Sequence, residues 1–200
     1  MSETRGRAGA DKEAAPASMT GRRIALRPAT DADAEWNFNL ILRLGIASVP
    51  RLDRFASAYA ETAAAHFIAC DLRSDVQVGY SSLHNADPAG RHIELGVLTD
   101  PDCSIPAVGA EAFFLTANYA FVSLPICKLY MRVTEASAAE FGGTLATMSR
   151  REGTLREHFY FRGRHWDVYI MAVHRDDWLR LGKPIADRIS RAVLYLSRCQ

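Results

Sequence analysis

The chain has 200 residues, of which 48% are apolar and 24% are charged, and its formal net charge is +1. This balance gives no basic surface for duplex nucleic acid and no attraction to an anionic membrane. The length fits one domain with short extensions, and no apolar run approaches the roughly 20 residues that span a bilayer. The four cysteines form no Cys-x-x-Cys pair, so we expect no metal site, no disulfide framework and a cytoplasmic location.

The two ends of the chain differ from its middle. Residues 2–18 contain no Ile, Leu, Val or aromatic residue, so we expect a disordered tail over 1–20 and no secretion signal. The domain itself is expected over 21–180. Residues 181–200 are expected to add a helical extension, whose apolar face would pack on its own domain or form a homodimer.

Alternating apolar residues predict strands, and apolar residues spaced by three or four predict helices. In chain order, these patterns predict a strand at 22–28, helices at 30–43 and 55–65, strands at 66–72, 76–83 and 92–98, a helix at 109–122, a strand at 129–133, a helix at 138–150, a hairpin of 154–161 with 166–173, and a helix at 184–197. Consecutive antiparallel strands followed by a crossover helix indicate an α/β (α+β) fold with a mixed, mostly antiparallel sheet of about seven strands flanked by helices.

Three stretches of sequence resemble the GNAT (GCN5-related N-acyltransferase) superfamily: RRIALRPATDADA, IELGVLTDP and REGTLREHFYFRGRHWDVYIMAVHRDDW. The last is similar to the branch that acetylates ribosomal-protein N-termini, through Glu152-Gly153, Arg156, Gly163, Asp167 and Trp178. The resemblance covers about residues 22–178. It implies the GNAT fold, no tightly bound cofactor, and transfer of an acyl group from a pantetheine thioester to a small-molecule or peptide amine.

The resemblance also implies an acyl-CoA site at the loop after the fourth strand. There the branch has Arg-Gly-x-Gly, whereas this sequence has Ser104-Ile105-Pro106-Ala107. The basic residue and both glycines are absent, and Pro106 lacks an N–H donor. Backbone groups at the following helix start remain for one phosphate. The implied donor contacts are Leu98, Cys103, Ser104, Ala107, Val108, Gly109 and Ala110.

The altered loop leaves three hypotheses open. The favoured one is an N-acyltransferase in specialised biosynthesis, whose donor is an acyl carrier protein with a single phosphate. The second is a conventional acetyl-CoA-dependent N-acetyltransferase of a protein N-terminus or small amine. The third is a non-catalytic or repurposed GNAT-like protein that no longer binds CoA.

The candidate catalytic residues follow from the resemblance and from strand alternation. Glu94 is expected to act as general base, directly or through water, although a half-exposed strand residue is an equal alternative. His92 shares its face, and His84 ends the preceding strand. Ser137 stands where the branch usually has Asn, with helix capping as the alternative role. His158 and Tyr160 share a strand face that faces either an acceptor pocket or the core.

Overall fold

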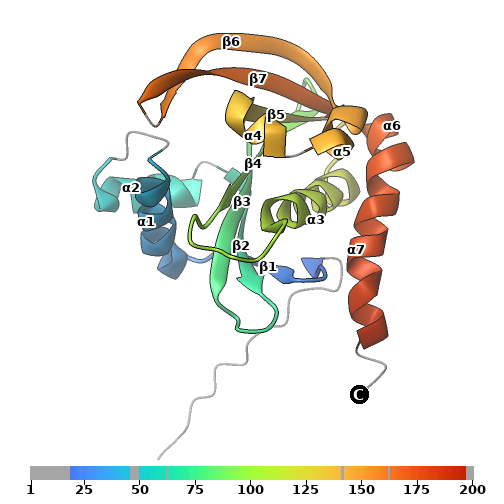
Figure 1. The fold of residues 1–200 in the computed structure, drawn as a ribbon, viewed down its shortest axis with the longest axis horizontal. Coiled ribbons are helices and arrows are strands. Elements are labelled where there is room, and N and C mark those ends of the chain that lie inside the picture. The colour runs from blue at the N-terminus through green and yellow to red at the C-terminus, as the bar shows by residue number, and fades with distance from the viewer. Residues whose placement is uncertain (1–18, 46–49, 62, 141, 162, 197–200) are drawn as a thin grey trace, which may run out of the picture.

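The computed structural model describes residues 19–45, 50–61, 63–140, 142–161 and 163–196 (Figure 1). Seven strands form one sheet in the order β1-β2-β3-β4-β5-β7-β6. The strands are β1 Ile24–Pro28, β2 Ala63–Asp71, β3 Gln77–Asp87, β4 His92–Thr99, β5 Lys128–Thr134, β6 Arg150–Phe161 and β7 Arg164–His174. The helices are α1 Ala34–Leu44, α2 Leu52–Glu61, α3 Val108–Ser123, α4 Glu135–Glu140, α5 Gly142–Met148, α6 Arg175–Asp177 and α7 Lys183–Leu196, and a π-helical turn at Trp178–Gly182 joins the last two.

Helices cover both faces of the sheet. Leu40 of α1 packs in one buried cluster with Ile68 and Tyr80 of the sheet. Phe113 of α3 packs in another, against the strand residues that point the opposite way, such as Ile93 and Leu129. Figure 1 accordingly shows α1 and α2 on one side of the molecule and α3 and α7 on the other. The side chains that alternate with the α3-facing ones therefore lie on the α1 side of the sheet.

The expected order of elements and the mixed sheet are confirmed. One assignment is wrong: residues 63–65 belong to β2 rather than to a helix, because the chain there pairs with His84 and Leu83 of β3. Pairing with a neighbouring strand has overridden the helix propensity of alanine. The third expected strand runs on to Asp87, and the helix expected at 138–150 consists of two short helices, α4 and α5.

The residues on which the family resemblance rests hold the fold together. The Trp178 side chain is fully buried and stacks on Phe121 at a centroid distance of 5.5 Å. A Cβ at Gly182 would lie 2.3 Å from the Trp178 ring, so glycine is required there. Asp167 accepts hydrogen bonds from the Glu157 N–H at 2.9 Å and from the Arg156 guanidinium at 2.7 Å, and it thereby fixes the β6–β7 hairpin.

Both ends of the described chain join this domain. The side chain of Met19 is buried with Ile24 and Leu26, so packing begins two residues before the expected boundary. Ala186 of α7 is buried, and Ile185 and Ile189 pack against the core, so these three residues face their own domain. The tail at 1–18 lies outside the described residues. Within the described part, no helix is both long and apolar enough to cross a membrane.

Replacing Trp178 with Ala is expected to lower the free energy of unfolding by about 3–5 kcal/mol, because the cavity left among the aromatic rings cannot collapse fully. Urea denaturation followed by fluorescence or circular dichroism measures the change. The neighbouring Leu179 is 50% exposed, and Leu179→Ala is expected to change stability by about 0.5 kcal/mol or less. Equal losses in the two variants would contradict the role of Trp178.

Candidate active site

The two central strands pair for a short distance and then separate. β4 and β5 are parallel, and their ladder contains three residue pairs, of which the last joins Glu94 to Tyr130. Both strands continue beyond it, through Leu95–Thr99 and Met131–Thr134, without pairing with each other. Buried backbone N–H and C=O groups need partners. The diverging strands therefore present backbone groups to anything placed between them.

Glu94 stands where the ladder ends, on the α1 side of the sheet. Its Oε1 accepts a hydrogen bond from Nη2 of Arg132 at 3.2 Å, and its Oε2 lies 3.6 Å from Nε2 of His84. The Glu94 side chain is 18% exposed, whereas that of Arg132 is 56% exposed. The three side chains come from β3, β4 and β5, so pairing of the sheet assembles a carboxylate, an imidazole and a guanidinium at one point.

His84 is held from two sides. Its Nδ1 lies 3.3 Å from Oγ of Ser82, and its Nε2 faces Glu94. Burial lowers the pKa of His84 because the charged imidazolium loses hydration; Glu94 favours the charged form and Arg132 opposes it. A neutral imidazole beside a carboxylate is suited to accept a proton near neutral pH.

Gly96 leaves room beside this cluster. It pairs with Ser82 across β3 and β4, and a Cβ at this position would lie 3.3 Å from Oγ of Ser82 and 3.4 Å from Cε1 of His84. A larger residue would press on both side chains. Because Gly96 has no side chain, the space above β4 beside His84 is not filled by this residue.

His92 is engaged elsewhere. Its Nε2 lies 3.4 Å from Oδ2 of Asp87, and its ring meets the ring of Tyr130 edge to face at 5.2 Å. It shares the strand face of Glu94, as expected from the alternation. The contacts of the described residues do not join it to the Glu94–His84–Arg132 cluster.

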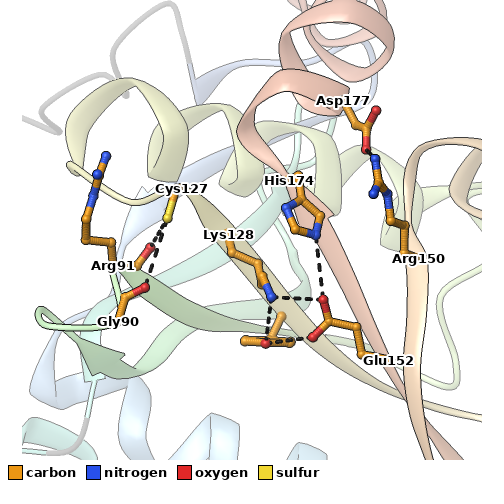
Figure 2. A network of polar contacts seen from close by, with 9 residues as sticks. Gly90, Arg91, Cys127, Lys128, Arg150, Glu152, His174 and Asp177 are labelled. Carbon is orange, nitrogen blue, oxygen red and sulfur yellow. Dashed lines mark hydrogen bonds and ion pairs between the residues drawn. The ribbon is translucent and has the colours of Figure 1, made fainter.

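A second polar network lies next to His92 on β5, β6 and β7, and Figure 2 shows Lys128, Glu152 and His174 turned toward one another. Nζ of Lys128 donates to Glu152 at 2.9 Å, the Tyr130 hydroxyl donates to Glu152 at 2.7 Å, and Nε2 of His174 lies 3.6 Å from Glu152. The hydrogen bonds from Lys128 and Tyr130 lower the pKa of Glu152. Lys128 and Glu152 compensate each other's charge, which suits a structural network.

The loop between β4 and α3 is held by a residue from α1. Arg43 binds both carboxylate oxygens of Asp100, at 2.7 and 3.0 Å, and also donates to Asp102 at 2.9 Å. The N–H of Asp102 donates back to Asp100. The Arg43 guanidinium is thus already paired with two carboxylates of this loop.

Ala107 retains the backbone conformation of a glycine. It precedes α3 with φ 60° and ψ 23°, in the left-handed region, which costs an alanine about 1–2 kcal/mol. The sequence aligns this alanine with the second glycine of the branch's loop. A left-handed residue at a helix start turns successive N–H groups toward one point, the arrangement that binds anions. The loop thus holds an alanine in a conformation that glycine adopts without strain.

The other residues expected to contact the acyl donor differ in how far their side chains are buried. The Val108 side chain is buried, and Cys103 and Leu98 are half-buried against core clusters. Ser104 is exposed and Gly109 and Ala110 are half-buried at the start of α3. The Val108 side chain therefore faces the protein, whereas Leu98 and Cys103 keep part of their side chains accessible. Their contacts with a donor stay a prediction.

Ser137 lies at the start of α4, on the β5 side of the separated strands. Its N–H donates to Oγ1 of Thr134 at 3.2 Å, and the Thr134 hydroxyl donates to the Ser137 hydroxyl at 3.0 Å. Ser137 was expected to cap this helix as an alternative role. The residue that caps it is instead Thr134, whose hydroxyl accepts the Ser137 N–H. Its catalytic role stays a prediction.

The structure does not place His158 and Tyr160 in a pocket. Both side chains are exposed, and the Tyr160 ring packs on His165 at 5.1 Å. The pairing of β6 with β7 shifts between Leu155 and Phe159, and Glu157 has a φ of 48°, so His158 falls in a bulge. Both side chains are therefore at the surface of β6, and their role in lining an acceptor pocket stays a prediction.

Sequence reasoning missed three residues that shape the site. Arg132 reaches Glu94 from β5, Ser82 contacts His84 from two residues earlier on β3, and Arg43 reaches the loop from α1. Strand alternation puts Arg132 on the same side as Tyr130, but no local pattern gives its distance from Glu94.

Among the described residues, no group of His, Cys, Asp and Glu is suited to hold a metal ion.

Comparison with known proteins identifies the fold. No protein-family model and no curated protein sequence matches the chain. It resembles the structure of a chimera of the spermidine N-acetyltransferase SpeG from Vibrio cholerae and hSSAT, with a TM-score of 0.68 and 20% identity over 79% of this chain and 99% of that one. It also resembles the Vibrio cholerae spermidine N-acetyltransferase in complex with CoA and spermine, with a TM-score of 0.63 and 20% identity over 78% and 98% of the two chains.

The chain therefore has the GNAT fold, as the sequence predicts. At this level of identity the likeness establishes the fold and does not assign a substrate. The neighbours are spermidine N-acetyltransferases, and membership of the branch that acetylates ribosomal-protein N-termini stays a prediction.

Replacing Ala107 with Gly is expected to raise the free energy of unfolding by about 1 kcal/mol, because glycine adopts the left-handed conformation without strain. Urea denaturation measures the effect. Ala110, which lies inside the first turn of α3, is the matched control: Ala110→Gly is expected to destabilise by up to about 1 kcal/mol. Loss of stability in both variants would show that Ala107 is not strained.

The lowered pKa of His84 predicts an imidazole titration below the ordinary value of 6.5. Histidine NMR in a pH series measures it; Glu94→Gln is expected to move the midpoint further down and Arg132→Gln to move it up, since these charges act in opposite directions. The unfolded chain takes up the proton at the higher pH. The contribution of His84 to stability is therefore lost as the pH falls from about 6.5 through the lowered pKa. A midpoint at or above 6.5 would contradict the effect of burial.

Proposed function

We propose that this protein is an N-acyltransferase that moves an acyl group from a pantetheine thioester to an amine. The observation that carries the proposal is the Glu94–His84 pair, 3.6 Å apart, at the point where β4 and β5 separate. The unpaired strand edges provide backbone groups for an amide-bearing arm such as pantetheine. The likeness to acetyltransferases, one of them in complex with CoA and spermine, supports this class of reaction.

The proposed reaction needs one proton transfer and one attack. The neutral amine nitrogen attacks the thioester carbonyl carbon, and its proton passes to His84 or Glu94, directly or through water. The tetrahedral intermediate collapses by breaking the C–S bond, and the thiolate leaves and takes up a proton. Backbone N–H groups along the separated strand β4 stabilise the carbonyl oxygen as its charge develops.

His84 and Glu94 divide this work according to their surroundings. Arg132 donates to Oε1 of Glu94, so one oxygen of this carboxylate is already engaged. His84 is kept neutral by burial. We therefore assign proton acceptance to His84 and orientation of the imidazole, together with stabilisation of its charged form, to Glu94.

The finer proposal concerns the donor. The left-handed Ala107 supports a loop that still receives a phosphate, while Pro106 lacks a donor and Arg43 is bound to Asp100 and Asp102. We propose that the loop holds one phosphate and does not grip a diphosphate. Both an acyl carrier protein and acyl-CoA supply that phosphate, and the single-phosphate requirement favours the carrier protein as the physiological donor.

The donor proposal is tested by comparing acetyl-CoA, acetyl-4′-phosphopantetheine and acetyl-pantetheine with one acceptor. We expect kcat/KM for the first two donors to agree within about tenfold, and removal of the last phosphate to cost about tenfold or more, since one charge-assisted hydrogen bond contributes roughly 1.5–3 kcal/mol. A preference for acetyl-CoA of about 100-fold or more over acetyl-4′-phosphopantetheine would show that the diphosphate is gripped.

Catalysis is tested by His84→Gln and Glu94→Gln. We expect each to lower kcat by about 10²-fold or more, the range typical of a lost general base or its partner, with donor KM little changed. Glu35→Gln, at an exposed position on α1, is the control and is expected to keep full activity. Full activity in both site variants would favour direct attack without these residues, and absence of transfer with every donor would favour the non-catalytic alternative.

A further inference from the structure

Arg132 places a positive charge beside Glu94, the partner of the proposed proton acceptor His84. Its guanidinium lies 3.2 Å from Glu94, yet its side chain is more than half exposed. A guanidinium carries several N–H donors in a planar fork. In the described part of the chain, the one hydrogen bond made by Arg132 uses Nη2, so its remaining donors face solvent next to the site.

Arg132 points into the same side of the sheet as the catalytic pair. Met131 and Val133 on either side of it are buried in the core under α3, so Arg132 projects toward the α1 side, as Glu94 does. Its cross-strand neighbour on β7 is the apolar Ile170. Within the described residues, Glu94 is the carboxylate that pairs with Arg132, because the nearby Glu152 is bound to Lys128 and Tyr130.

The cluster therefore offers two opposite functions within a short distance. His84 and Glu94 attract and deprotonate an amine, and Arg132 offers unused N–H donors to an anion. A guanidinium pairs strongly with a carboxylate through parallel hydrogen bonds. It also favours the neutral form of a nearby amine, which is the form that attacks a thioester.

We propose that the acceptor is an amine that also carries a carboxylate, of the α-amino acid class, with its carboxylate bound to Arg132 and its amine beside His84. This inference rests on the proposed acyl transfer and specifies its substrate class. Spermine, the molecule bound in one structural neighbour, carries only positive groups. Arg132 disfavours such an acceptor here.

The test compares amino acids with the amines that lack their carboxylate: phenylalanine with phenethylamine, and lysine with cadaverine, with spermidine as a further acceptor. We expect the better amino acid to exceed its paired amine by about tenfold or more in kcat/KM, the contribution of one charge-assisted pair. Arg132→Gln is expected to remove this preference by raising KM for the amino acid while leaving the amine little changed. Arg132→Lys is expected to restore part of it.

The control is Arg180→Gln, which removes another exposed arginine paired with a carboxylate, Asp177 at 3.0 Å. It is expected to leave the preference unchanged. Equal or better use of phenethylamine, cadaverine or spermidine, or an unchanged preference in Arg132→Gln, would overturn the inference while acyl transfer itself stands.

A binding measurement separates this inference from the proposed function. Titration with phenylalanine or lysine is expected to shift the His84 imidazole signals in NMR. The paired amines, phenethylamine and cadaverine, are expected to shift them less, and Arg132→Gln is expected to abolish the amino acid effect. If no acyl transfer is observed with any donor, this result still supports an amino acid site. No response to either amino acid in the unaltered protein would overturn it.

Discussion

The site depends on where one strand pairing stops. β4 and β5 share a ladder of three residue pairs and then diverge, while Leu95 and Met131, the next residues on the two strands, both remain buried in the core that includes Phe113 of α3. The core therefore keeps the strands on one surface although they no longer bond to each other. Glu94 is the last residue of β4 that pairs with β5, and His84 and Arg132 reach it from the strands on either side. A longer ladder would close the gap between the two strands.

Much of the fold was accessible from the sequence, for physical reasons. Alternating and helical apolar patterns gave the element order, and Trp178, singled out by the resemblance, is fully buried in the core. The strand at 63–65 was missed because its alanines favour helix and only pairing with β3 makes them a strand. The position of Glu94 followed from strand alternation, but its distance from His84 and Arg132 depends on the register of three strands, which no local pattern contains.

The loop before α3 shows the limit of an argument from residue types. Loss of two glycines predicts loss of a phosphate cradle, since glycine adopts left-handed conformations without strain. Ala107 nevertheless has a φ of 60°, and Arg43 holds Asp100 and Asp102 from α1. The surrounding contacts outweigh the preference of alanine. The loop has no basic side chain and lacks one N–H donor at Pro106, yet its backbone still turns into α3 through a left-handed residue.

The central claim is that the separated strands β4 and β5 receive the pantetheine arm of the donor. The most direct measurement is a crystal structure with an unreactive thioether analogue of acetyl-CoA. We predict that its pantetheine lies between Leu95–Thr99 and Met131–Thr134, with its acyl end beside Glu94. An arm bound on another surface while the two strands stay vacant between them would contradict the account.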